Sequence, residues 1–284
     1  MITTPSFVMN SGNDPTYEKL LDELIQEVFG FSFQSWFDVQ VWDDRYESYS
    51  IIENGKMLAN LCIYRTELMI SGKPLHAHQF GAVAVHPSHR GKGYVRSLLN
   101  EVRRIYPGVP AFLSANESVR EFYPKLGFRR ISVHRPIIEE RVDHPITGAK
   151  VSPADPDLWK ALKERNQHSN EFASLNSMPI EIFHLIMDYS ENIYFLPEAD
   201  IYLVAEQKGM KLFIADIIAS HPIDFQSLKP HLPFTGVEHV EFGFSPDHLG
   251  IEATWLPAGQ DSLWFIHGDW DLPDHFCFPV MSIT

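Results

Sequence analysis

Residues 81–99 read GAVAVHPSHRGKGYVRSLL, and this stretch decides the fold of the first half of the chain. Its apolar start predicts a β-strand that ends before Pro87. After a turn with two glycines, apolar residues recur at helical spacing from Tyr94 to Ile105, with polar residues on the opposite face. Pro107 then ends the helix. The stretch therefore predicts a strand, a glycine-containing turn and an amphipathic helix in succession.

The turn before this helix carries the chemistry. Backbone N–H groups at a helix start have no partner and the macrodipole is positive there, so the position attracts phosphate oxygens. Gly91 and Gly93 allow the backbone to approach a bulky pyrophosphate and to adopt angles that other residues resist. Arg90, Lys92 and Arg96 add positive charge to a chain whose net charge is −14. Together these features predict a pyrophosphate site.

A family resemblance becomes specific at this turn. It resembles motif A of the GCN5-related N-acetyltransferases (the GNAT superfamily), which is written Arg/Gln-x-x-Gly-x-Gly/Ala after a strand. Arg90 and Gly93 match the first and fourth positions, whereas Val95 departs from the small sixth residue. The enhanced-intracellular-survival type of this superfamily shares the departure, and its motif segment is similar to VAVHPSHRGKGYVRSLL at residues 83–99.

A second match lies downstream, where residues 114–128 read SANESVREFYPKLGF. The segment resembles motif B, with an Asn seven residues before a Tyr and a closing Gly-Phe. The resemblance implies that Asn116 lies near the pantetheine arm and Tyr123 near the thioester sulfur. We expect Asn116 to cap a helix that runs toward Leu126 and that ends or kinks at Pro124.

The resemblance also implies a reaction, in which an amine attacks the acetyl thioester directly. The strand at residues 83–85 would offer backbone groups to the pantetheine and to the thioester carbonyl. Tyr123 would protonate the leaving thiolate, although a core aromatic is the alternative interpretation of this residue. The predicted cofactor-binding residues for acetyl-CoA are Val83, Ala84, Val85, Arg90, Gly91, Lys92, Gly93, Tyr94, Val95, Arg96 and Asn116.

No sequence match identifies the base that deprotonates the amine, and water or a nearby histidine could serve. In the survival-type family the terminal carboxylate of the chain acts as the base. This chain lacks that family's third domain, so we do not transfer the role to Thr284. His76 and His78 would share one strand face, but no third ligand is evident, and we therefore predict no metal site.

Strands and helices interleave in both halves, which indicates an α/β or α+β protein. The predicted elements of the first half are a helix at residues 17–29 and strands at residues 49–54, 57–64, 67–70, 76–85 and 111–114. Residues 143–157 are rich in Pro, Gly and Asp and mark a boundary. We predict a GNAT fold, with a mixed central sheet and flanking helices, for a catalytic domain at residues 1–142. We expect residues 143–284 to form a smaller, degenerate GNAT-like domain without a cofactor motif, which walls the substrate cleft.

Composition limits the class of protein further. Apolar residues make up 44% of the 284 residues and charged residues 21%, as in a globular protein with a core. No apolar run reaches the roughly 18 residues of a membrane helix, and no signal peptide is evident, so we expect a cytoplasmic protein. The acidic charge argues against nucleic-acid binding and favours amine substrates, although solubility alone also explains it. Cys62 and Cys277 lie in apolar runs, which indicates buried thiols.

These observations predict a bacterial N-acetyltransferase that uses acetyl-CoA and acts on a primary amine of a small molecule, as a monomer or a homodimer. The alternative within enzymes is transfer of another acyl group or an aminoacyl group by the same fold. The alternative outside enzymes is a non-catalytic regulatory module that binds coenzyme A. Trp255, Trp264 and Trp270 would either line the substrate cleft or pack in the core.

Overall fold

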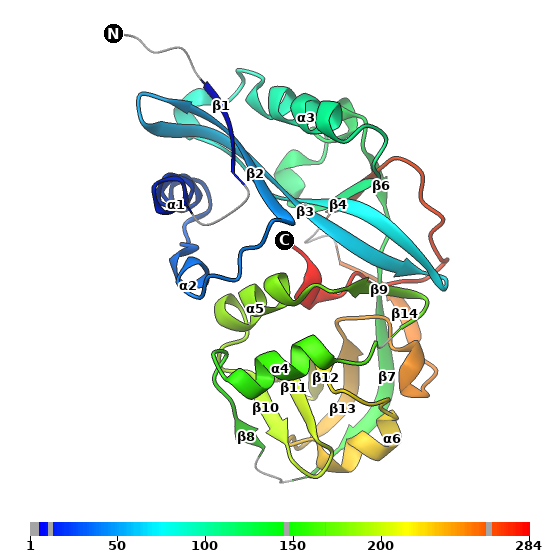
Figure 1. Cartoon of the computed structure of the whole chain (residues 1–284). Helices are drawn as coiled ribbons and strands as arrows, with labels where there is room; N and C mark the ends of the chain where they lie inside the picture. The colour runs from blue at the N-terminus through cyan, green and yellow to red at the C-terminus, as the bar shows by residue number, and fades with distance from the viewer. Residues whose placement is uncertain (1–5, 11–13, 145–147, 168, 260–262) are drawn as a thin grey trace.

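Two β-sheets organise the chain, one in each half of the molecule (Figure 1). The computed structural model describes residues 6–10, 14–144, 148–167, 169–259 and 263–284. Within these ranges the first sheet has eight strands, β1 (Ser6–Asn10), β2 (Tyr46–Glu53), β3 (Lys56–Ile70), β4 (Lys73–Val85), β5 (Ala111–Ala115), β15 (Leu263–His267) and β6 (Arg129–Ile131) in this order, with β9 (Phe172–Leu175) beside β3. The second has seven, in the order β14 (Thr254–Pro257), β7 (His134–Val142), β13 (Val237–Phe242), β12 (Lys211–Ile218), β11 (Ile201–Lys208), β10 (Ile193–Leu196) and β8 (Ala149–Lys150).

The helices are short and flank the sheets. The α-helices of the described chain are α1 (Pro15–Phe29), α2 (Gln34–Phe37), α3 (Tyr94–Ile105), α4 (Pro156–Glu164), α5 (Met178–Met187) and α6 (Phe225–Leu228). The side chains of β3 alternate between the two faces of the first sheet. Cys62 packs in one cluster with Leu21 of α1, whereas the adjacent Ile63 packs in another with Leu98 of α3. α1 and α3 therefore cover opposite faces of this sheet.

The predicted first helix is confirmed, and its ends have clear causes. Asp14 caps α1 by accepting hydrogen bonds from the backbone N of Thr16 and Tyr17 at 3.0 and 3.2 Å. Gly30 ends it in the left-handed conformation, with φ of 80°. α3 also has the predicted bounds, Tyr94–Ile105.

β3 is a single strand, although the sequence predicted two strands with a break at Arg65 and Thr66. Both polar side chains find partners within the folded chain. Arg65 Nε lies 3.3 Å from Glu47 Oε1, and Thr66 Oγ1 lies 3.3 Å from Ser174 Oγ. The strand continues through these positions because Glu47 of β2 offers Arg65 an ion pair and Ser174 of β9 offers Thr66 a hydrogen bond.

The prediction of a helix between Asn116 and Leu126 was wrong. The structure has two 3₁₀ turns there, Glu117–Val119 and Pro124–Leu126. Pro124 lacks the N–H that would continue an α-helix, and it starts the second turn. Asn116 does act as a cap, because its side chain accepts from Ser118 N at 3.1 Å.

The two sheets exchange strands across the expected boundary between residues 142 and 143. β7 precedes this boundary, but it pairs with β13 and β14 in the second sheet. β15 follows it, but lies between β5 and β6 in the first sheet. The division into domains at residues 1–142 and 143–284 stays a proposal, and the hydrogen-bonded sheets do not separate there.

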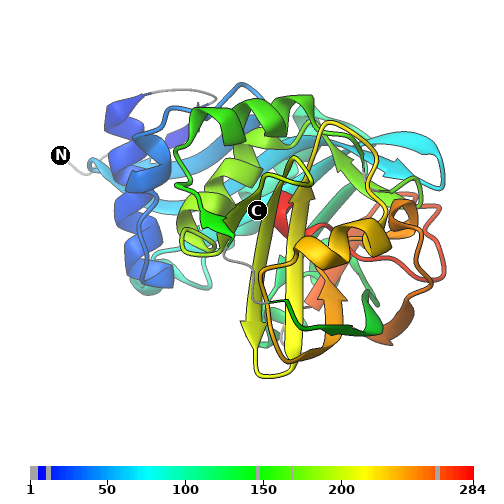
Figure 2. The same cartoon turned by 90° about the horizontal axis from the view of Figure 1, so that it is seen from below.

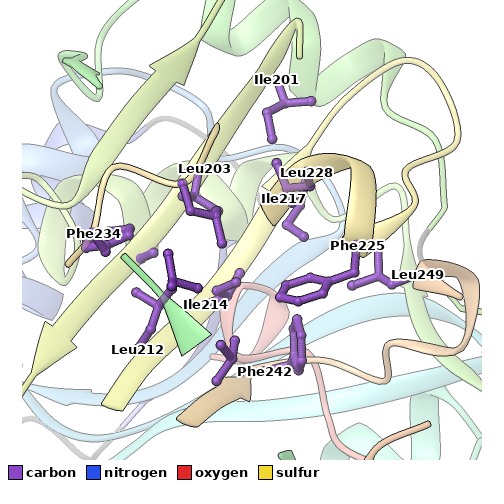
Figure 3. Close-up of a cluster of buried hydrophobic side chains, with 14 of the residues drawn as sticks. Ile201, Leu203, Leu212, Ile214, Ile217, Phe225, Leu228, Phe234, Phe242 and Leu249 are labelled. Atoms are coloured by element: carbon purple, nitrogen blue, oxygen red, sulfur yellow. The ribbon is translucent and has the colours of Figure 1, made fainter. Parts of the chain in front are cut away.

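The second sheet repeats the strand arrangement of the first. In the first sheet β3 and β4 are antiparallel and β5 is parallel to β4, and in the second β11 and β12 are antiparallel and β13 is parallel to β12. Buried apolar side chains from these strands and α6 form its core (Figure 3). The ring of Phe225 lies 5.7 Å from that of Phe242 within this cluster. The mixed α/β class predicted for the chain is confirmed. Cys62 and Cys277 are free and buried, as expected.

Candidate active site

The turn between β4 and α3 is open to solvent. Gly91 and Gly93 adopt left-handed backbone angles, with φ of 78° and 79°, and a Cβ added at either would meet no described atom within 4 Å. Arg90 and Lys92 are exposed on the same turn. The first hydrogen bond within α3 runs from Ser97 N to Gly93 O at 3.1 Å. The backbone N–H groups that precede Ser97 therefore have no acceptor within the helix.

Positive charge surrounds these free N–H groups. Arg96 donates to the carbonyl oxygen of Lys125 at 3.3 Å, which holds its guanidinium beside the second 3₁₀ turn. At the other end of α3, Arg104 is instead paired with Glu101 at 2.5 Å. Free amides, a positive helix end and exposed cations together form a site suited to an anion such as pyrophosphate.

β4 and β5 separate next to this turn. In the described chain they pair in parallel only at His78 with Ala111 and at Gln79 with Phe112. β5 continues against β15 as far as Ala115, but its edge toward β4 has no strand partner beyond Phe112. In the described chain β4 and β5 therefore share no further strand pairing beside the residues predicted to contact pantetheine.

A bulge at Ala82 follows the last paired residues of β4 and β5. Ala82 has a φ of 46°, and the register with β3 shifts between Asn60 and Cys62. Asn60 Nδ2 donates to the carbonyl oxygen of Ala82 at 3.0 Å, so the group that leaves the ladder is still satisfied. A bulge bends its strand and redirects the following backbone, here residues 83–85.

A buried polar network holds Asn60 in place, and no sequence motif indicated it. Asn60 Oδ1 accepts hydrogen bonds from Ser48 Oγ at 2.6 Å and from Ser50 Oγ at 2.9 Å. The hydroxyl of Tyr17 lies 2.6 Å from Ser48 Oγ. The available signal was the presence of small polar residues within apolar strand segments.

Tyr123 lies under α3 in the same apolar cluster as Val95 and the partly buried Val83. Its ring packs 5.8 Å from Phe128 and 5.4 Å from Phe265. Burial raises the pKa of the Tyr123 phenol to about 12, so the hydroxyl keeps its proton at neutral pH. The structure thus brings together predicted residues of the strand, the helix and the second motif, and leaves Asn116 exposed at the edge.

Residues 16–131 match the family model described as an acetyltransferase (GNAT) domain. This part of the chain is a GNAT domain. It contains the open turn, the bulge and both 3₁₀ turns described above.

Solved structures extend the likeness in fold to both halves. A probable N-acyltransferase of unknown function from Enterococcus faecalis V583 matches with a TM-score of 0.59 and 16% identity, over 92% of this chain and 72% of that one. Eis1 from Mycobacterium abscessus matches with a TM-score of 0.57 and 14% identity, over 92% and 73% of the two chains. A GCN5-related N-acetyltransferase from Kribbella flavida matches with a TM-score of 0.53 and 14% identity, over 93% and 71%. The comparison with curated proteins gives no significant match.

The C-terminal segment runs between the two sheets and ends in the GNAT domain. Figures 1 and 2 show it in the interior, from two directions. Phe278 is sandwiched between Trp264 and Phe112, with ring centroids 4.2 and 4.8 Å apart and nearly parallel planes. Val280 N donates at 2.8 Å to the carbonyl oxygen of Gly243, which directly follows β13 of the second sheet. The segment therefore contacts both sheets, and Trp264 packs in the core.

The last residues of the chain, Thr284 included, reach β4 beside the bulge, a position that no sequence pattern predicted. With its amide oriented to satisfy both groups, Gln79 donates to Ser282 O at 3.1 Å and accepts from Thr284 N at 2.5 Å. A Cβ added at Gly81 would clash with the Thr284 side chain. Gly81 is therefore needed for the close approach of this segment to the central strand.

A cavity of about 630 Å³ lies beside this segment. Its lining combines Asp43 and Arg45 of the GNAT domain, Glu181 and Asp216 of the second half, and Ser282 of the C-terminal segment. A cavity of this size suits a small molecule.

One wall of the cavity carries a buried charge cluster. Arg165 donates to Asp216 with both terminal nitrogens, at 2.8 and 2.6 Å, and to Glu181 Oε1 at 3.1 Å. Ser177 Oγ donates to the same Glu181 oxygen at 2.7 Å. Burial raises the pKa of the Glu181 carboxyl, while the Arg165 charge opposes this shift. Sequence patterns did not indicate this cluster, because its residues are far apart along the chain.

No helix of the described chain is long and apolar enough to cross a membrane. His, Cys, Asp and Glu form no group of three or more that could hold a metal ion in the part of the chain that the structure describes. The absence of a metal cofactor stays a prediction.

Proposed function

We propose that the protein transfers the acetyl group of acetyl-CoA to a primary amine of a small molecule. The observation that carries the proposal is the open turn at residues 90–96, where free N–H groups and exposed cations lie beside the gap between β4 and β5. The pyrophosphate of coenzyme A fits the turn by charge and hydrogen bonding, and its extended pantetheine arm fits the unpaired strand edge.

The residues would divide the chemistry as follows. A backbone N–H of residues 83–85 stabilises the oxyanion that forms when the amine attacks the thioester carbonyl. Tyr123 donates a proton to the leaving thiolate, because its phenol is neutral at pH 7 and carries this proton before the reaction. The acceptor occupies the cavity of about 630 Å³, next to the C-terminal segment.

A turnover assay tests this proposal. The purified protein is incubated with acetyl-CoA and a panel of primary amines, and release of the free thiol is measured. The proposal predicts turnover with at least one amine, and no turnover at any pH would support the alternative of a non-catalytic module. The same panel with other acyl thioesters tests the alternative of a different acyl group.

A pair of glycine variants locates the cofactor site in this assay. Gly93→Ala and Gly55→Ala both place a Cβ at a left-handed φ, 79° and 72°, with no described atom within 4 Å. Both therefore cost about 1 kcal/mol in backbone strain. Only Gly93→Ala should raise the KM for acetyl-CoA, by about 10-fold, because only this Cβ separates the backbone from the pyrophosphate. An equal effect of both variants would contradict the assignment.

Location and assembly remain predictions from the sequence. A bacterial origin, a cytoplasmic protein and a monomeric or homodimeric state agree with this function. The identity of the acceptor is a question for the amine panel.

A further inference from the structure

A chain of hydrogen bonds links the buried charge cluster to the central strand of the GNAT domain. Glu181 Oε1 accepts from Ser177 Oγ at 2.7 Å, and Ser177 Oγ lies 3.0 Å from Ser282 Oγ. The backbone of Ser282 is in turn bound by Gln79, two residues before Gly81. We propose that Glu181 receives a proton of the acceptor ammonium group through Ser282 and Ser177. This inference rests on the proposed function.

The cavity gives an acceptor access to this chain. Ser177, Glu181 and Ser282 all line it. Glu181 and Ser282 are 3% and 6% exposed, so water competes little for their polar groups. An amine in this cavity beside Ser282 Oγ would face the relay, and Gln79 joins the same segment to β4 two residues before Gly81.

The surroundings of Glu181 favour proton uptake without exposing the carboxylate. Arg165, which follows α4, binds Glu181 Oε1 at 3.1 Å, and Asp216 of β12 shares this guanidinium. His184, on the next turn of α5, and Tyr64 of β3 also act on it electrostatically. Two carboxylates share one guanidinium, so the cluster can take up a proton and become neutral.

Atoms and charges balance along the relay. Ser282 Oγ accepts one proton from the ammonium nitrogen and passes its own proton to Ser177 Oγ, which passes its proton to Glu181 Oε1. The neutral nitrogen then attacks the acetyl carbon, and the carbon–sulfur bond breaks. The thiolate takes its proton from Tyr123, and the second proton lost by the nitrogen restores the phenol. Glu181 releases its proton to solvent after the product leaves.

The test compares Glu181→Gln with wild type on two acceptors of similar shape. Benzylamine is protonated at pH 7 and needs a proton acceptor, whereas the nitrogen of O-benzylhydroxylamine is neutral and does not. Glu181→Gln should lower kcat for benzylamine by about 100-fold or more, and remove the rise of kcat with pH on the acidic side. It should change kcat for O-benzylhydroxylamine by less than about 3-fold.

Ser177→Ala breaks the relay but leaves the ion pair of Glu181 with Arg165, and should give the same difference between acceptors even if Glu181→Gln fails to fold. Glu164→Gln, an exposed change at the end of α4, is the matched control and should leave both rates unchanged. An equal loss with both acceptors, or an unchanged acidic limb in Ser177→Ala, would overturn the relay. Absence of wild-type turnover with every amine of the panel, these two included, would overturn the proposed function and the relay together.

Discussion

At the scale of the residue, Tyr123 is the side chain whose role the sequence left most open. Its ring packs in the core, as the alternative interpretation expected, and its neutral phenol also suits the predicted proton donor. A buried ring and a reactive hydroxyl are compatible, because packing fixes the direction of the hydroxyl.

Tyr123→Phe separates these two roles. The phenylalanine keeps the ring contacts with Phe128 and Phe265, so we expect the melting temperature to change by only a few degrees. The kcat should fall by about 10²- to 10⁴-fold, with coenzyme A affinity unchanged. Steady-state kinetics and calorimetric titration measure both quantities, and Tyr202→Phe in the second sheet is the control. Full activity of Tyr123→Phe would leave the residue a purely structural role.

His78 makes the stability of the protein depend on pH. Burial lowers the pKa of this histidine to about 4, with Glu47 opposing and Arg65 adding to the shift. Between pH 6.5 and 4 the unfolded chain therefore binds a proton at this site that the folded protein does not. The free energy of unfolding is therefore unaffected by this group above pH 6.5 and decreases as the pH falls toward 4, by up to about 3 kcal/mol.

His78→Gln tests this dependence by urea unfolding at several pH values. As the pH falls from 6.5 to 4, the variant should lose about 3 kcal/mol less stability than the wild type. Identical slopes in the two proteins would show that His78 does not titrate in this way.

Single residues could be predicted where the chemistry is local in the sequence. Arg90, Gly91 and Gly93 stand within a few residues of one another, so a motif reveals them. Asn60 acts on Ala82, and Glu181 acts with Arg165 and Ser177 through contacts that only the fold creates. No local pattern identifies such partners in a single sequence.

At the scale of the element, the bulge in β4 depends on a side chain of β3. Asn60→Asp keeps an acceptor for Ser48 and Ser50, but replaces the N–H that Ala82 O requires with a carboxylate oxygen. We expect a loss of about 2–3 kcal/mol in the free energy of unfolding and a lower kcat/KM for acetyl-CoA.

Denaturant unfolding and initial rates check this change. Asn100→Asp on the exposed face of α3 makes the same substitution without a buried partner, and should change neither quantity. Wild-type values for Asn60→Asp would mean that the bulge forms without this hydrogen bond.

Periodicity predicted the helices and strands that have a clear apolar face and residues that mark both ends. α1 and α3 have strong apolar faces and clear ends, and the sequence predicted both. The division of β3 was wrong because Arg65 and Thr66 find partners on other strands. The helix after Asn116 was wrong because Pro124 favours separate turns.

At the scale of the whole molecule, the exchange of strands and the C-terminal segment join the two halves. The sequence predicted two similar halves, but not that β7 and β15 would each pair in the other sheet. Strand pairing over such distances depends on the complete fold, and a short apolar segment does not specify its partner.

Phe278→Ala tests the coupling between the halves. This fully enclosed ring stacks on Trp264 and Phe112, so its removal should cost about 3–5 kcal/mol. Scanning calorimetry should show one transition at a lower temperature, because neither sheet is complete without the other half. Phe29→Ala, at a position 45% exposed, is the control with a smaller expected loss. Two separate transitions in the wild type would show that the halves unfold independently.

Binding of the coenzyme A pyrophosphate at the start of α3 underlies the proposed function, and calorimetric titration with coenzyme A measures this binding directly. We expect one saturable site, weakened at least 10-fold in the double variant Arg90→Ala/Lys92→Ala and unchanged in Arg104→Ala at the far end of the helix. Absence of saturable binding to the wild type, or equal affinity in all three proteins, would contradict it.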